Sequence, residues 1–116
     1  MNKLIVILIL YVAVFAGNAG AADQQALNNR LSYLKDIPEI AWVRIERNNV
    51  YIGFKERPPD LNNIVNAAAV HGNRAYGFGV HVWAIEAKYP NWKPGDAPFY
   101  CEATARQGKL EGSGCK

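Results

Sequence analysis

Residues of the types used in catalysis and metal binding are scarce in this sequence. Among its 116 residues are two histidines and two cysteines, and the only serines are Ser32 and Ser113. A metal site needs several ligands close together, whereas His71 falls at the expected end of a helix and His81 in an expected strand. Neither serine lies in the G-x-S-x-G context of a nucleophile elbow. We therefore expect neither a metal nor a cofactor.

A strong excess of charge is also missing. The formal net charge is only +3, and it becomes +2 if the leader described below is removed with its one lysine. Proteins that bind single-stranded nucleic acid combine aromatic side chains with a markedly basic surface. The charge balance therefore favours a partner other than nucleic acid.

Long apolar runs are absent except at the N-terminus. Lys3 supplies a positive charge, residues 4–15 are all apolar or aromatic, and Ala19-Gly20-Ala21 provides a small-residue cleavage site. This order predicts a secretory signal peptide over residues 1–21, because about a dozen apolar residues are fewer than the roughly twenty that span a bilayer. We expect an exported protein, periplasmic or secreted, that is not inserted in the membrane after cleavage.

The chain beyond this leader, residues 22–116, has the length of one small domain. Its two cysteines, Cys101 and Cys115, lie fourteen positions apart. An even number of cysteines in a small exported domain predicts a disulfide, and a loop of this length contributes about 3 kcal/mol in the chain-entropy description. The two cysteines do not have the C-x-x-C spacing that would indicate a redox role.

Apolar periodicity predicts two helices and two hairpins. Leucines 27, 31 and 34 share one helical face within residues 23–35. Residues 41–54 alternate around Asn48-Asn49, which predicts a hairpin with these two asparagines as its loop and with Val43 opposite Phe54 and Ile45 opposite Ile52. All the aliphatic side chains of this hairpin then share one face.

A second helix is predicted to follow Pro58-Pro59-Asp60 and to end at Gly72 in a left-handed cap. Residues 76–88 then alternate as a long strand, residues 99–106 form a fourth strand, and the glycine-rich tail from Gln107 is held by Cys115. The predicted order is α-β-β-α-β-β. This order indicates an α+β two-layer sandwich with a four-stranded antiparallel sheet and helices on one face.

The face of the sheet turned away from the helices is the leading candidate for a binding surface. Large aromatic side chains beside an arginine are the composition of protein interfaces. The candidates on this face are Trp42, Arg44, Tyr51, His81 and Trp83. Three other arrangements compete: the first helix or the tail crosses this face, the chain dimerises through it, or the sheet curls and places Trp83 in a second small core.

Trp92 is a further candidate binding residue. It lies in a proline-rich loop, residues 89–96, and prolines lower the entropy lost when a side chain is presented to a partner. The competing arrangement has Trp92 folded back on the edge of the core.

These features predict a small non-catalytic binding or inhibitor-like protein whose partner is a protein or an envelope component. One alternative is a small envelope hydrolase that uses a pair among Glu46, Glu86 and Glu102, with His81 as a further candidate. Another is a structural subunit of an envelope assembly, and a homodimer is compatible with the same aromatic face.

Overall fold

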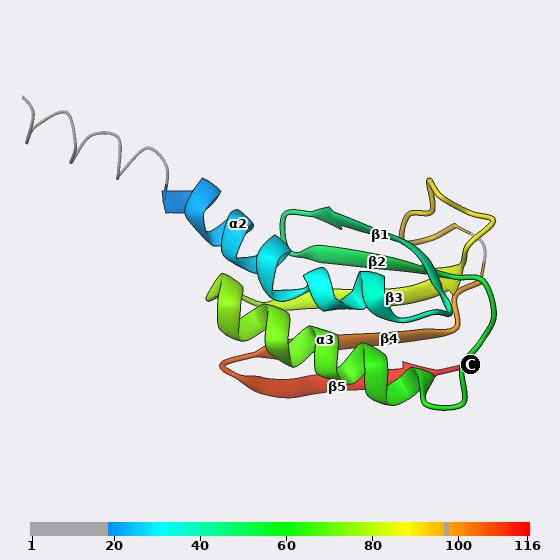
Figure 1. Cartoon of the computed structure of the whole chain (residues 1–116). Helices are drawn as coiled ribbons and strands as arrows, with labels where there is room; N and C mark the ends of the chain where they lie inside the picture. Colours follow the sequence, from blue (N-terminus) through cyan, green and yellow to red (C-terminus); the bar gives the residue numbers. More distant parts are fainter. Residues whose placement is uncertain (1–18, 97) are drawn as a thin grey trace, which may run out of the picture.

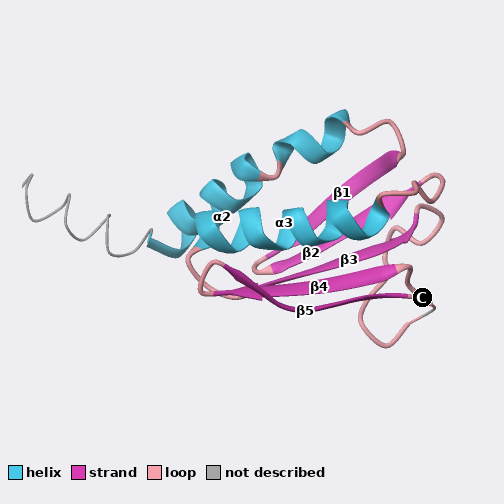
Figure 2. Cartoon of the chain, turned by 90° about the horizontal axis from the view of Figure 1, so that it is seen from below, coloured by secondary structure: helices cyan, strands magenta, loops and turns pink. Residues whose placement is uncertain are grey.

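The computed structural model describes residues 19–96 and 98–116 and has an α+β fold in two layers (Figure 1). Figure 2 shows the helices on one face of a five-stranded sheet. The helices are α2 (Ala19–Arg30), η1 (Ser32–Asp36) and α3 (Leu61–Tyr76). The strands are β1 (Ile40–Glu46), β2 (Asn49–Phe54), β3 (Val80–Glu86), β4 (Cys101–Arg106) and β5 (Lys109–Cys115).

The signal peptide predicted over residues 1–21 lies outside the described residues except for Ala19–Ala21, which begin α2. Export therefore stays a prediction. None of the helices in the described part of the chain is long and apolar enough to cross a membrane.

The sheet has five strands and mixed directions, so the prediction of four antiparallel strands was wrong in these two respects. The strands are adjacent in chain order, and β2 and β3 are parallel whereas the other neighbours are antiparallel. Helix α3 is the cause, because it carries the chain back along the sheet and β3 must then run in the direction of β2. The fifth strand is the tail, which pairs with β4 from Arg106↔Lys109 to Cys101↔Cys115.

The predicted β1–β2 hairpin is present, but its register differs by two residues. Val43 lies opposite Ile52 and Ile45 opposite Val50, and the loop is Arg47-Asn48. Arg47 has the positive φ of the turn, at 57°. Asn48 instead joins the hairpin to β3, because its side chain donates to the Gly79 carbonyl and its carbonyl accepts from the His81 amide. A shift of two residues leaves every side chain on its predicted face.

The predicted end of the second helix at Gly72 was also wrong. Helix α3 continues to Tyr76, and Gly77 provides the left-handed cap with a φ of 87°. Gly72 is buried within the helix, where a Cβ atom would lie 3.0 Å from the Leu27 side chain and 3.3 Å from that of Val80. Its role is therefore close packing of α3, and the following strand begins at Val80 instead of Tyr76.

The predicted first helix is divided into α2 and η1, which are separated by Leu31. Its predicted apolar stripe is nevertheless buried, together with one face of α3 and the helix-facing side chains of the sheet. This main core includes Leu27, Leu31, Leu34, Val65, Ala68, Ala69, Val50, Ile52, Phe54, Val80 and Val82. The alternation predicted for β1, β2 and β3 thus correctly assigns which side chains face the helices.

Candidate functional site

A second apolar cluster covers the face of the sheet that is turned away from the helices. Its source is the loop between β3 and β4, described at residues 87–96 and 98–100 and called here the 87–100 loop, which folds back across this face. The buried members are Tyr51, Trp83, Ile85 and Trp92, with Trp42, Tyr89 and Phe99 packed against them. We call this cluster the second core.

All six residues predicted as a binding set lie on this face, but most of them contact one another. The Trp83 ring stacks on His81 at 3.6 Å between centroids and on Tyr51 at 5.3 Å, and Trp92 lies 5.9 Å from it. Tyr51, Trp83 and Trp92 are only 4, 7 and 3 % exposed. These three side chains are therefore packed against one another within the second core.

The Trp42 ring occupies the space beside Gly53, which lies opposite it in the neighbouring strand. A Cβ atom on Gly53 would come within 2.2 Å of the Trp42 ring, so only glycine leaves room for the indole there. The indole Nε1 donates to the Ala87 carbonyl at 2.9 Å. Trp42 therefore fixes the first residue of the 87–100 loop to the sheet.

We expect Gly53→Ala to lower the free energy of unfolding by about 1–3 kcal/mol, because the added methyl group must displace the Trp42 ring. Denaturant unfolding of both proteins measures the change. Gly112→Ala is the matched control, because a Cβ atom there meets nothing within 4 Å. Equal stability of the two variants would contradict the role assigned to Gly53.

Arg44 is a second anchor of the 87–100 loop. Its guanidinium donates hydrogen bonds to the carbonyls of Pro90 and Trp92 and lies 4.3 Å from the centroid of the Tyr51 ring. Its Nε atom is 2.9 Å from a Glu46 carboxylate oxygen. Arg44, predicted as a contact residue, thus serves to hold the loop backbone in one conformation.

His81 sits between the Trp83 ring and Glu102 on the same face. Its Nε2 atom is 3.5 Å from a Glu102 carboxylate oxygen. Burial lowers the pKa of His81, and the carboxylate of Glu102 opposes this shift only in part. The neutral imidazole is therefore the form that the folded protein favours.

The pKa of His71 is shifted in the same direction as that of His81. His71 lies inside α3, where Nδ1 is 3.0 Å from the Tyr33 hydroxyl. Burial lowers the pKa of His71, and the positive charges of Arg30 and Arg74 lower it further.

Stability should fall on mild acidification, because the unfolded chain takes up protons on these histidines before the folded protein does. The fall begins near pH 6.5, the ordinary pKa of histidine, and continues down to the lower pKa of the folded state. We expect His81→Gln to lose less unfolding free energy between pH 7.5 and 5 than the parent protein. Urea unfolding at several pH values measures this, and an unchanged pH slope would contradict it.

The three carboxylates of the hydrolase alternative do not converge. Glu86 points to the opposite face of the sheet from Glu102, because it is one residue beyond Ile85, which lies in the second core. Glu46 and Glu102 share a face but are three strands apart, which is about 14 Å. Each carboxylate lies beside a different side chain: Glu46 beside Arg44, Glu86 beside Lys88 and Glu102 beside His81.

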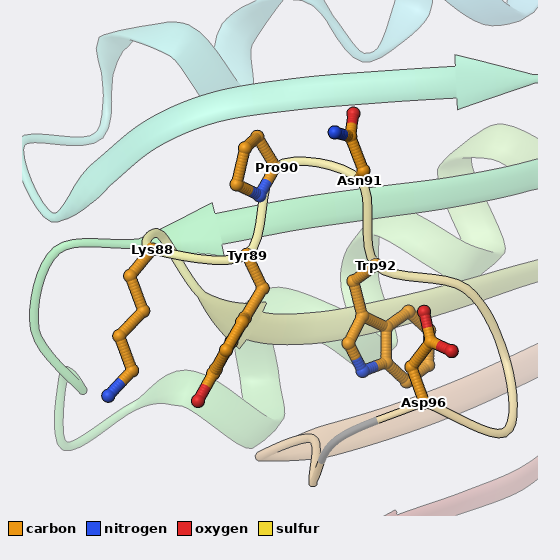
Figure 3. A pocket seen from close by; sticks show the side chains of 6 residues that line it. All are labelled: Lys88, Tyr89, Pro90, Asn91, Trp92 and Asp96. Atoms are coloured by element: carbon orange, nitrogen blue, oxygen red, sulfur yellow. The ribbon is translucent and has the colours of Figure 1, made fainter.

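The outer surface of the 87–100 loop forms a shallow, open hollow of about 450 Å³. Figure 3 shows Tyr89 and Trp92 on one side of the loop and Pro90 and Asn91 on the other. The hollow is lined by Lys88, Tyr89, Pro90, Asn91, Trp92 and Asp96. Prolines and aromatic residues in this segment indicated a stiff loop, but no local pattern indicated its clamp by Arg44, which is 46 residues away from Pro90.

Three further findings concern possible metal ligands, the fold and the comparison with known proteins. Within residues 19–96 and 98–116, no three histidine, cysteine, aspartate or glutamate side chains lie close enough to hold a metal ion. The described residues form an α+β fold with two α-helices, one short 3₁₀ helix and a mixed five-stranded sheet. Comparison of the chain with family models, curated proteins and solved structures finds no match.

Proposed function

We propose that this protein is a small exported, non-catalytic binding or inhibitor-like protein, and that it contacts its partner through residues 88–96. The observation that carries the proposal is the anchoring of this loop. Arg44 holds the carbonyls of Pro90 and Trp92, and Trp42 holds that of Ala87. Three side-chain hydrogen bonds from β1 thus fix the backbone of this loop to the sheet.

Anchoring of this kind supports a recognition function because it lowers the entropy that the loop loses on binding. Trp92 is buried in the second core, and a turn closed by the Asp96 carboxylate on the Lys93 amide, at 2.9 Å, follows it. The exposed side chains between these fixed points are therefore presented in one arrangement. Pro90, Asn91 and Lys93 are among them.

The proposed partner is a protein or an envelope component. The hollow beside Tyr89 is open and mixes apolar with polar lining, so it can receive one side chain of a partner. Trp42 and Trp83, first predicted as contact residues, act in this proposal as the support beneath the loop.

The test places a photo-crosslinking amino acid at Asn91 of the exported protein in the producing cells. The control position is Asn63, which is exposed on α3 on the helix side of the molecule. We expect an adduct of one defined mass from position 91 and none from position 63. Excess unlabelled protein should suppress the adduct, whereas an excess of the Tyr89→Ala/Asn91→Ala variant should not.

Adducts of equal yield at both positions, or none at either, would overturn the proposal. An adduct of twice the protein's own mass would instead favour self-assembly, the structural-subunit alternative. Suppression by the Tyr89→Ala/Asn91→Ala variant would show that the contact does not depend on this loop.

A further inference from the structure

A second hollow lies at the opposite end of the sheet from the 87–100 loop. It has a volume of about 420 Å³ and is bounded by the end of α3, the segment 77–79 and the β4–β5 turn. These segments meet at the end of the sheet from which α2 leaves the domain (Figure 1). Its lining includes Asn73, Arg74, Phe78, Gly79, Arg106 and Gly108.

The walls of this hollow are tied together by Asn73, which is 4 % exposed and is the one buried polar residue of the described chain. Its Nδ2 donates to the Phe78 carbonyl at 2.6 Å, and its Oδ1 accepts from the Gly108 amide at 2.7 Å. One side chain therefore fixes the segment after α3 and the β4–β5 turn relative to each other. Because both bonds are internal, the hollow is formed before any ligand arrives.

Two guanidinium groups border the hollow. Arg74 donates to the Gly108 carbonyl at 3.4 Å, and Arg106 lies over Gly79, where a Cβ atom would be 3.2 Å from its Cγ and Nε atoms. The Nε of Arg106 is also 3.4 Å from a Glu111 carboxylate oxygen. A guanidinium has five N–H donors, more than these contacts use, so both groups have donors left for an anion.

An apolar surface adjoins these charges. Phe78 is 65 % exposed, the most exposed large apolar side chain of the described residues, and its ring forms a T-shaped pair with that of Tyr76 at 5.8 Å between centroids. Its backbone carbonyl is held by Asn73, so the position of the ring is constrained at its base. An exposed phenyl ring beside two arginines suits a ligand with both an anionic and an apolar part.

We propose that this hollow binds a phosphate monoester, with the phosphate between Arg74 and Arg106 and its apolar substituent against Phe78. Arginine pairs match the oxygens of a phosphate dianion in charge and in the planar spacing of their donors. The negative end of the α3 dipole and the Glu111 carboxylate oppose the anion, but together they amount to about one and a half negative charges, fewer than the two positive charges of the arginines. This site is separate from the 88–96 loop and does not rest on the function proposed for it.

Amide NMR titration with phenyl phosphate and with inorganic phosphate tests the proposal. We expect phenyl phosphate to shift the amide signals of Gly77, Gly79 and Gly108, and to bind more tightly than inorganic phosphate. Arg74→Gln and Arg106→Gln should each weaken binding at least about tenfold, the effect of one lost charge-assisted hydrogen bond. Phe78→Ser should weaken binding of phenyl phosphate and leave inorganic phosphate unchanged.

Arg47→Gln is the matched control, because it removes the same charge at the same end of the sheet from a residue outside the hollow. Glu111→Gln should strengthen binding, since it releases Arg106 from its carboxylate partner. Equal losses for Arg47→Gln and Arg106→Gln, or no shifts at the three glycines, would overturn the proposal.

A phosphate monoester is found both in soluble metabolites and in the headgroup of phosphatidic acid. Sedimentation with vesicles of phosphatidylcholine containing phosphatidic acid separates these sources. Sedimentation that is lost in Arg74→Gln and Arg106→Gln would assign the site to the headgroup. Binding of phenyl phosphate without sedimentation would assign it to a soluble ester.

Discussion

Trp92→Ala is expected to lower the free energy of unfolding by about 3–5 kcal/mol, the range for removal of a buried tryptophan. The side chain is 3 % exposed, although it lies in a loop, and it contacts the rings of Tyr51, Trp83 and Phe99. Its removal leaves a cavity in the second core that the aromatic rings around it cannot fill. Chemical denaturation followed by circular dichroism measures the loss.

The control for Trp92→Ala is Phe78→Ala, which removes an exposed aromatic ring and should change stability by no more than about 0.5 kcal/mol. Hydrogen exchange adds a local test. Amides of residues 89–96 should exchange faster in Trp92→Ala than in the parent protein. The amides of α3 should keep the same relative exchange rates in both proteins. Stability equal to that of the parent protein would contradict the existence of a second core.

Reduction of the Cys101–Cys115 disulfide is expected to lower the free energy of unfolding by about 3 kcal/mol. The two cysteines lie opposite each other in β4 and β5, with a sequence separation of 14. Every residue of β5 is exposed and β4 is its only neighbour in the sheet, so no buried side chain holds the strand in place. Its contacts with α3 lie at the surface, such as that of the Ser113 hydroxyl with the Asn62 amide oxygen at 3.2 Å. Thermal unfolding with and without reductant measures the effect.

Single substitutions of the two cysteines provide the control. From the sequence alone, Cys101→Ala and Cys115→Ala should be equally destabilising, because either removes the bond. In the structure Cys101 is fully buried and Cys115 is exposed, so Cys101→Ala should be the more harmful by the small packing loss of one sulfur atom. Equal stability of the parent protein with and without reductant would show that the disulfide contributes nothing.

The sequence predicts the α+β class and the faces of the strands because these depend on local alternation. The predicted and the observed register of the hairpin differ by two residues, so both place the same side chains toward the helices. These side chains are Val43, Ile45, Val50 and Ile52. The exact register depends instead on Asn48, which bonds to residues at the start of β3. Such a contact cannot be read from the hairpin itself.

The missed elements have similar causes. Gly72 has the residue type of a helix end, but its tertiary contact with Leu27 keeps it in α3. The β5 segment contains Gly112 and Gly114 and has no buried side chain, so it lacks the alternation by which a strand is recognised. Its pairing with β4 is stabilised by the disulfide, which the cysteine count did predict.

The arrangement of side chains on the outer face of the sheet follows only in part from the sequence. The sequence correctly groups Trp42, Tyr51 and Trp83 on one face, because strand periodicity assigns side chains to faces. It does not reveal that Trp92 covers this face, since the two competing arrangements of the loop have the same local pattern. The hollow beside Phe78 was not predicted, because it joins Asn73 to Gly108 over 35 positions of sequence.

The arrangement of the two chain ends has a practical consequence for surface-based measurements. The Lys116 amide donates to the Tyr100 carbonyl, so the C-terminus lies beside the 87–100 loop, while α2 leaves the domain from the opposite end (Figure 1). If the protein is immobilised on a sensor chip through the N-terminal end of α2, the 87–100 loop should point into solution and the Phe78 hollow should lie close to the chip surface. Capture through a C-terminal tag should reverse this orientation, so comparison of the two immobilisations would separate ligands of the two ends.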